Sequence, residues 1–401
     1  MCLDVISTLF ERFSLMFNTR RTWLKEALLI GILLATALLA GCIGPRGWPG
    51  TTSEGNTLYV CTMDGRILAL NSANGAQKWT WTAPAAQIGK VQPGNLTSIG
   101  STFFNCNRGG TGQLKPGYFY GAPALANGTI YIGYFKGLVY AIDAATGEGV
   151  WEHDIKSNIA SGLTVAANTV FIGSSNGNLT ALDAGNGSVD WEFSTEEEVW
   201  STPSVVDGVV YFGSLDHNLY ALNAADGSKR WSFRSGGGIG STPLVVGDVV
   251  YVGSFDHKFH AVDANTGIPR WTFEGASDWF WSEAVYSNNT VYVGSLDHNV
   301  YALDADNGTP AWPKPFTTSA KVRSSPVISG DLLVVASEDG KIYGLNLETG
   351  EKKWEFDGVK DKVLSPLNAT AGKVYINSQD NRLHALNIET GRQLWSVKLG
   401  E

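Results

Sequence analysis

The chain of 401 residues contains few charged residues, few histidines and few cysteines, and each shortage argues against a class of partner or site. Only 17% of the residues are charged, the formal net charge is −9, and no run of lysines and arginines appears. A protein that binds nucleic acid needs a basic face, so this composition argues against such a partner. The four cysteines include no CxxC pair and no cluster with the six histidines, so the sequence offers no metal site of the zinc type.

Motifs of common enzyme classes are missing as well. The sequence shows no nucleophile elbow, no HExxH zinc motif and no phosphate-binding loop. We therefore name no catalytic residue.

What the chain does contain is a repeat marked by tryptophan. The intervals between successive members are 72, 40, 40, 40, 41, 42 and 41 residues. A period near 40 residues is typical of an array of one supersecondary unit. The eight repeated tryptophans are Trp79, Trp151, Trp191, Trp231, Trp271, Trp312, Trp354 and Trp395.

The segment 201–235 illustrates one unit. Its predicted strands are 203–206, 209–214, 219–223 and 230–234, and turns fall at Asp207-Gly208, Asp216-His217 and Asp226-Gly227. Four short strands joined by tight hairpins give one antiparallel sheet, whose two faces are buried when eight sheets are arranged radially. The sequence therefore predicts an all-β protein, an eight-bladed β-propeller at 51–401.

The first interval is longer than the others because of a segment at 82–119 without strand alternation. It is rich in glycine, proline, asparagine, glutamine and serine. Such a composition predicts a loop inserted between the first two blades, over one mouth of the central channel.

The phrase Ala-x-Asp-x-x-Thr-Gly-x-x-x-Trp, complete at 141–151, closes one unit, and variants of it occur in all eight. It resembles the tryptophan-docking motif of the quinoprotein (pyrroloquinoline quinone) propeller family, over residues 51–399. Glycine accepts the positive φ of the turn, and the indole stacks on the neighbouring blade. The eight tryptophans are therefore expected to be structural.

The N-terminal residues predict export and a lipid anchor. The apolar run at 28–40 has 13 residues, follows Arg20, Arg21 and Lys25, and ends in Leu39-Ala40-Gly41-Cys42. That ending resembles the bacterial lipobox, which implies a signal peptide at 1–41, lipidation of Cys42 and a tether at 42–50. A plain signal anchor is the alternative. The basic residues fit general secretion and twin-arginine export alike, and a start at Met16 would give a signal of ordinary length.

Two further cysteines, Cys61 and Cys106, remain after Cys2 and Cys42 are assigned. An exported protein can hold a disulfide, and a bond between these two would pin the inserted loop to the first blade. The alternative is two free thiols.

Three neighbouring units carry an Asp-His pair in the second hairpin, where other units have glycine or asparagine. Histidine tolerates the left-handed backbone conformation, so a turn role is the simpler interpretation. The alternative is that the histidines bind a ligand at one rim. They are His217, His257 and His298.

The connections between blades leave each sheet on the same side as these hairpins, so both groups face one channel mouth, here called the rim. Aromatic and charged side chains gather in the connections at 194–201, 274–282 and 315–325. They could bind a sugar or an extended peptide, or they could form inter-blade packing with a solvated acidic edge. The candidates are Glu196, Glu197, Glu198, Trp200, Asp278, Trp279, Trp281, Glu283, Lys321 and Arg323.

The resemblance allows an enzyme or a scaffold. A quinone-dependent dehydrogenase of this family would need a bound Ca²⁺, a catalytic Asp and commonly two adjacent cysteines, and the chain has no adjacent cysteines. In size, blade number and lipobox the chain is more similar to the propeller lipoproteins of the outer-membrane barrel-assembly machine. That similarity implies a monomeric, lipid-anchored scaffold without a cofactor, whose partner is another envelope protein. The dehydrogenase and a surface sensor of sugars or peptides remain as alternatives.

Overall fold

Tight turns between short apolar runs fold each unit into four antiparallel strands. The computed structural model describes residues 49–84 and 119–400. In the unit at 201–235 the first hairpin turns at Asp207 and Gly208, with φ values of 48° and 74°. Two consecutive left-handed residues are the signature of a two-residue hairpin loop whose twist matches the strands. The strands of this unit are β13 (Ser204–Val206), β14 (Val209–Gly213), β15 (Asn218–Asn223) and β16 (Lys229–Arg234).

The other units repeat this plan. The first three contain β1 (Thr51–Glu54), β2 (Thr57–Cys61), β3 (Arg66–Asn71), β4 (Gln77–Thr82), β5 (Ala124–Ala126), β6 (Thr129–Tyr134), β7 (Leu138–Asp143), β8 (Gly149–Asp154), β9 (Leu163–Ala166), β10 (Thr169–Gly173), β11 (Asn178–Asp183) and β12 (Val189–Ser194). The fifth and sixth contain β17 (Leu244–Val246), β18 (Val249–Gly253), β19 (Phe259–Asp263), β20 (Pro269–Phe273), β21 (Val285–Ser287), β22 (Thr290–Gly294), β23 (Asn299–Asp304) and β24 (Phe316–Thr317). The last two contain β25 (Val327–Ser329), β26 (Leu332–Ala336), β27 (Ile342–Asn346), β28 (Lys352–Phe356), β29 (Asn368–Thr370), β30 (Lys373–Ser378), β31 (Arg382–Asn387) and β32 (Gln393–Lys398).

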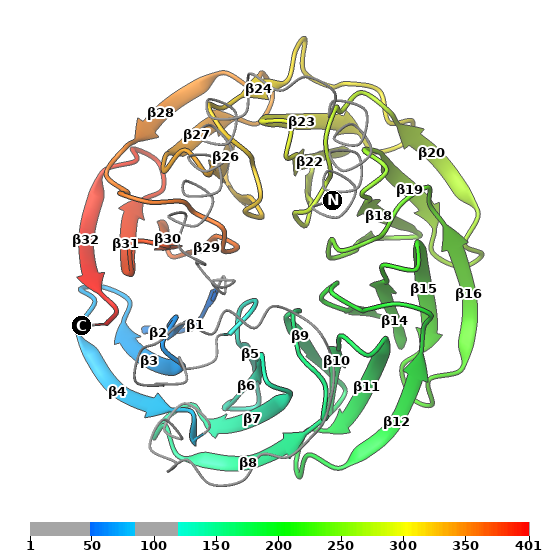
Figure 1. The fold of residues 1–401 in the computed structure, drawn as a ribbon. Helices are drawn as coiled ribbons and strands as arrows, with labels where there is room; N and C mark the ends of the chain where they lie inside the picture. Colours follow the sequence, from blue (N-terminus) through cyan, green and yellow to red (C-terminus); the bar gives the residue numbers. More distant parts are fainter. Residues whose placement is uncertain (1–48, 85–118, 401) are drawn as a thin grey trace, which may run out of the picture. The chain divides into compact units, whose positions relative to one another are not determined.

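The strands form eight four-stranded sheets, and within each sheet neighbouring strands are consecutive in sequence. Figure 1 shows the sheets as blades around a common centre, with the first strand of each blade innermost and the fourth outermost. All pairings between named strands are antiparallel, so the prediction of eight four-stranded antiparallel blades is confirmed.

The core is a series of layers between adjacent blades. The middle strands are buried on both faces, as in β14, where all five residues are buried, whereas β16 alternates between buried and exposed positions. One such layer joins Tyr211 and Leu219 of the fourth blade to Val250, Val252 and Val262 of the fifth. A sheet that is covered on both faces in this way needs apolar residues at consecutive positions, which explains runs such as VVYFG.

Each layer is tied at its outer edge by an indole hydrogen bond. Trp231 Nε1 donates to the carbonyl oxygen of Ala264 on the next blade at 2.9 Å, and Tyr211 Oη donates to the same oxygen at 3.3 Å. The same indole bond recurs at seven of the eight repeated tryptophans, with lengths of 2.9–3.2 Å. The Nε1 atom of the eighth, Trp395, is buried and has no partner in the described part of the chain.

The motif residues around each tryptophan make this docking possible. Gly267 lies over the Trp231 ring with a φ of 74°, and a Cβ there would come within 2.8 Å of the indole. Across the outer strand pair Trp231 faces Ala221, and the register shifts directly after this alanine. The small residue and the bulge together let the indole turn from its own strand onto the next blade.

The sixth blade departs from the plan in its outer strand. Pro313 and Pro315 follow Trp312, and proline cannot donate to a strand ladder. The fourth strand, β24, is therefore only two residues long. Trp312 still donates to the carbonyl oxygen of Leu347 at 2.9 Å, so docking does not require a regular outer strand.

The ring closes where the first and last blades meet. Asn377 Nδ2 donates to the carbonyl oxygens of Pro49 and Cys61, at 2.8 and 3.0 Å, and Arg66 donates to the carbonyl oxygen of Leu399 at 2.7 Å. A shared core of residues from both blades lies between these bonds. Each blade is one continuous stretch of chain, so the two ends meet by packing and hydrogen bonds without sharing a sheet.

The docking geometry predicts that Trp231→Ala lowers the free energy of unfolding by about 3–5 kcal/mol, because a large buried side chain leaves a cavity. Trp231→Phe keeps most of the apolar contact and removes the N–H donor, so it should cost only about 1–2 kcal/mol. Urea denaturation of both variants beside the wild type measures this. A loss below about 1 kcal/mol for Trp231→Ala would contradict the structural role of the indole.

Candidate functional site

The second hairpin of each blade is joined to the connection that enters the blade, and together they build the rim. The backbone N–H groups of Leu215, Phe255 and Leu296 donate to the carbonyl oxygens of Glu198, Gly238 and Trp279, each at 2.9 Å. Each of these three connections is therefore fixed against the hairpin of the following blade. This bonding gives rim residues from different blades defined positions relative to one another.

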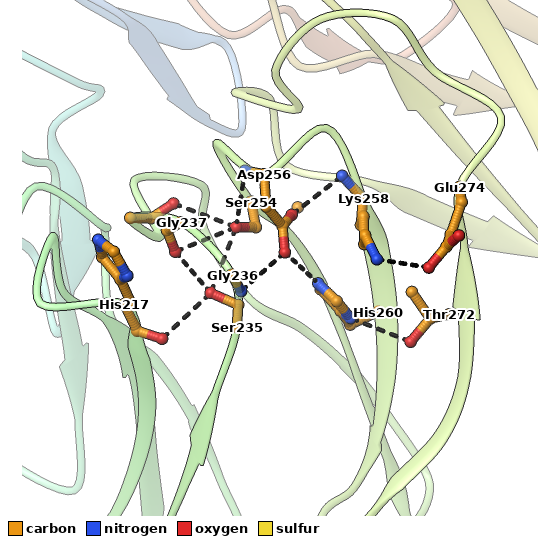
Figure 2. A network of polar contacts seen from close by, with 12 residues as sticks. His217, Ser235, Gly236, Gly237, Ser254, Asp256, Lys258, His260, Thr272 and Glu274 are labelled. Atoms are coloured by element: carbon orange, nitrogen blue, oxygen red, sulfur yellow. Dashed lines mark hydrogen bonds and ion pairs between the residues drawn. The ribbon is translucent and has the colours of Figure 1, made fainter.

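An aspartate strengthens each of these joints, as Figure 2 shows for Asp256. Its carboxylate accepts the backbone N–H groups of Gly236, at 2.8 Å, and Lys258, at 3.0 Å, and lies 3.4 Å from His260 Nε2. His260 is buried, and its Nδ1 lies 3.1 Å from Thr272 Oγ1. Burial raises the pKa of Asp256, but the bonds from His260 and Gly236 outweigh it and hold that pKa at about 2.

The same arrangement recurs in neighbouring blades. Asp216 accepts the backbone N–H of Glu196 at 3.2 Å, and Asp297 accepts that of Ser277 at 3.0 Å. In both blades a tyrosine, Tyr220 or Tyr301, replaces His260 and donates its hydroxyl to the aspartate at 2.7 Å. The aspartate of each Asp-His pair is thus a structural residue of the rim.

The three histidines of these pairs occupy the left-handed backbone region. The φ values are 76° at His217, 68° at His257 and 76° at His298, where the corresponding residue of other blades is glycine or asparagine. Within residues 49–84 and 119–400 no group of three histidine, cysteine or acidic side chains is placed to hold a metal ion. The geometry supports the turn interpretation and does not bring the three histidines together.

The aromatic rim residues do come together. Phe255 stacks on Trp279 with ring centroids 4.4 Å apart, and on Trp281 at 5.3 Å. Trp200, from the connection at 194–201, reaches Trp281 at 6.2 Å. These four residues form a cluster, the aromatic patch, that is built from two connections and one hairpin of the rim.

Phe255 is the member of the patch that sequence reasoning missed. It replaces the leucine found at the same hairpin position in the flanking blades, Leu215 and Leu296. The glycine-rich connection makes room for it, since a Cβ on Gly240 would lie 2.9 Å from the phenylalanine ring. Two features of the sequence point to this contact: the glycine run in the connection, and the phenylalanine in place of leucine at position 255.

Charged residues border the aromatic patch. The Arg323 guanidinium lies 4.9 Å from the Trp281 ring centroid and pairs with Glu338 at 3.1 Å. Lys362 pairs with the other oxygen of Glu338 at 2.8 Å, and Lys321 with Asp278 at 3.3 Å. Burial raises the pKa of Glu338, but the two cations outweigh it and lower that pKa overall.

The acidic run that precedes Trp200 lies at the edge of the rim. Glu196 and Glu197 are exposed and Glu198 is half-buried. Their backbone groups hold the hairpin of the fourth blade, because the carbonyl oxygens of Glu197 and Glu198 accept bonds from Ser214 Oγ at 3.2 and 3.3 Å. Two carboxylates therefore face solvent beside the patch.

Between the rim and the innermost strands lies a cavity of about 60 Å³ in the channel. Residues of seven blades line it, and they include Trp200, Trp281, Glu283 and Arg323. Burial raises the pKa of Glu283 to about 7. Phe280, which the sequence places beside these residues, instead packs fully buried against Gly253.

The predicted lipidation site Cys42, the signal peptide and most of the inserted loop lie outside the described residues. Cys61 is a free, fully buried cysteine, and burial raises the pKa of its thiol. Its predicted partner Cys106 also lies outside the described residues, so the disulfide stays a prediction. Where the structure describes the chain, it contains no helix of the length and apolar character that a membrane span requires.

Comparisons with known proteins agree with this architecture. Residues 104–204, 135–278 and 260–401 match the family model described as outer membrane protein assembly factor BamB. The crystal structure of BamB from Moraxella catarrhalis is similar, with a TM-score of 0.64 at 20% identity, over 84% of this chain and 91% of that one. The computationally designed protein Ika8 gives a TM-score of 0.69 at 16% identity, over 86% of this chain and 97% of that one. No curated protein matches the chain.

The rim geometry predicts that substitutions at two adjacent residues have different effects on the free energy of unfolding. Asp256→Asn should lower the free energy of unfolding by about 1–3 kcal/mol, because the backbone N–H groups of Gly236 and Lys258 lose a charged acceptor. His257→Gly should change it by less than about 0.5 kcal/mol, because glycine accepts the same positive φ. Urea denaturation at pH 7 compares them.

The pH dependence of the same variant has a defined sign. The folded pKa of Asp256 is about 2, below the unfolded value of about 3.9, so its contribution is complete above about pH 4 and disappears as the pH falls through 2. The difference between wild type and Asp256→Asn should therefore shrink only in acid. A difference that stays constant down to pH 2 would refute this assignment.

Proposed function

Because the chain belongs to the family described as outer membrane protein assembly factor BamB, we propose that it is a non-catalytic scaffold of the bacterial cell envelope. It acts in the assembly of outer-membrane proteins and binds another envelope protein through the rim. A lipid on Cys42 holds it at the membrane surface after export, and the single chain forms the complete ring.

The observation that carries this proposal is the aromatic patch with its charged border. Tryptophan and arginine are enriched in the residues that contribute most to protein–protein binding. Here Trp200, Trp279, Trp281 and Arg323 come from three different connections and lie in one cluster. The eight repeated tryptophans serve the blades, so these are additional aromatic residues that blade formation does not require.

The rim is also fixed before any partner arrives. The backbone bonds between connections and hairpins, together with the aspartates of the second hairpins, restrain the segments that carry the patch. A preformed binding surface loses less conformational entropy on association than a flexible one. This rigidity supports a role in holding a partner in one orientation.

Site-specific photo-cross-linking in intact cells tests the proposal. A benzoylphenylalanine in place of Glu197, on the rim, should form adducts with envelope assembly proteins. The same group in place of Glu351, an exposed residue of a third hairpin and so on the opposite side of the ring, should form none. Adducts of equal yield from both positions, or none from either, would contradict rim binding.

The same cells test the anchor and the enzymatic alternative. Cys42→Ser should move the protein out of the membrane fraction, whereas retention after a high-salt wash would point to an uncleaved helix.

The enzymatic alternative is tested by adding pyrroloquinoline quinone and Ca²⁺ and measuring dye reduction with alcohols or sugars. We expect no dye reduction; turnover would show that the protein is a dehydrogenase and would contradict the scaffold function.

A further inference from the structure

One position in each blade faces the channel directly before the innermost strand, and at this position the sixth blade differs from its neighbours. Gly162, Thr202, Thr242 and Ser325 line the channel cavity there, and the sixth blade contributes Glu283. Small neutral residues keep a channel free of obstruction and charge. The neighbouring blades form without a carboxylate at the equivalent position, so blade formation does not require Glu283.

The Glu283 carboxylate has no hydrogen-bond or ion-pair partner among the residues that the structure describes. The one bond of this residue is made by its backbone N–H, which donates to Ser325 Oγ at 3.2 Å. Arg323, the other charged residue of the cavity lining, pairs with Glu338 instead. Burial of the unpaired carboxylate raises its pKa to about 7, so a cation in the cavity would be favourable.

A second unpaired group faces the same cavity. Trp200 lines it, and its indole Nε1 is buried without a hydrogen-bond partner in the described part of the chain. Buried N–H groups are nearly always bonded to protein or to ordered water. The cavity therefore offers a charged acceptor, a neutral donor and the hydroxyls of Thr202, Thr242 and Ser325.

We propose that the channel cavity binds a primary ammonium group, the side-chain end of a lysine presented by the partner protein at the rim. The proposal rests on the proposed function, because it names the chemistry of the partner. An ammonium carries three donors, which the Glu283 carboxylate and the neighbouring hydroxyls accept. A water molecule retained beside it accepts the Trp200 N–H.

The dimensions of the site favour this group over other ligands. Its volume of about 60 Å³ is well below the roughly 300–1,000 Å³ of sites for drug-sized molecules. A compact ammonium suits it better than the wide planar guanidinium of arginine. A sugar would need a free aromatic face, and Trp281 already stacks with Phe255 and carries Arg323 over its ring.

The charge of the rim fits a cationic group that approaches from solution. Arg323, Lys321 and Lys362 are all paired with carboxylates, whereas the exposed Glu196 and Glu197 carboxylates face solvent. These two exposed carboxylates attract cations toward their side of the channel mouth.

Titration of the full-length protein with n-butylammonium chloride, a mimic of the lysine side chain, tests the site. The Trp200 indole N–H signal, assigned by its loss in Trp200→Phe, should shift and saturate in the wild type and in Glu351→Gln. Glu283→Gln, which keeps the side-chain size, should bind at least tenfold more weakly. Titrations with 1-butanol and with NaCl control for apolar contact and ionic strength. Absence of saturation, or equal affinity in Glu283→Gln, would overturn the proposal.

The pH dependence in the wild type gives a test that needs no folded variant. Lysine-like amines stay protonated at pH 6–8, whereas a carboxyl group with a pKa of about 7 loses most of its charge between pH 8 and 6. Affinity for n-butylammonium should therefore fall about tenfold over this interval. Arg323, the other titratable group in the lining, keeps its charge throughout. An affinity independent of pH would exclude Glu283 as the acceptor.

Cross-linking from position 197 separates this inference from the proposed function. If Glu283→Gln reduces the adduct with the envelope protein at least fivefold and Glu351→Gln does not, the lysine assignment stands. If the wild type forms the adduct and Glu283→Gln forms it equally, the lysine assignment fails and the scaffold function remains. If the wild type forms no adduct, the scaffold function fails, and with it the assignment to a partner.

Discussion

Neighbouring blades are positioned by one repeated hydrogen bond, which a tryptophan N–H donates to a carbonyl oxygen of the next blade. A single four-stranded sheet would expose two apolar faces, and the docked indole covers the outer part of each face while fixing the angle between blades. Trp231 illustrates how one bond organises several motif residues: Ala264 supplies the carbonyl, Gly267 the open turn, and Ala221 the space opposite. Repetition of this unit converts a local motif into a closed ring.

The rim is rigid because the docked blades hold both ends of each connection. A connection leaves one blade and enters the next, so its two ends are fixed wherever the blades are docked. The aspartates of the second hairpins add further restraints, and Asp256 does so through backbone N–H groups of both the connection and its own hairpin. Residues as far apart in sequence as Trp200 and Trp281 therefore meet with a geometry that neither segment could specify alone.

The parts of this architecture that the sequence predicts are those encoded within one repeat. Blade number, strand order, the left-handed turn at His217 and the use of glycine beside each indole all follow from patterns 40 residues long. Features that depend on two or more blades are harder to predict. The stacking of Phe255 between two tryptophans, the pairing of Arg323 with Glu338, and the unpaired Glu283 all require the relative placement of separate connections. In such cases the only local signal is a departure from the repeat, such as Phe255 in place of leucine.

If the docked indoles join eight blades into one cooperative ring, hydrogen exchange of the indole N–H protons will report that cooperativity. A linear array can lose its terminal units first, whereas a closed ring has no end from which to open. Nuclear magnetic resonance on the native protein should therefore give the seven docked indoles one common free energy of exchange, equal to that of global unfolding. The half-exposed Trp279 of the rim should exchange faster. Markedly lower values for the indoles of one or two blades would show that blades open independently, and would contradict the account.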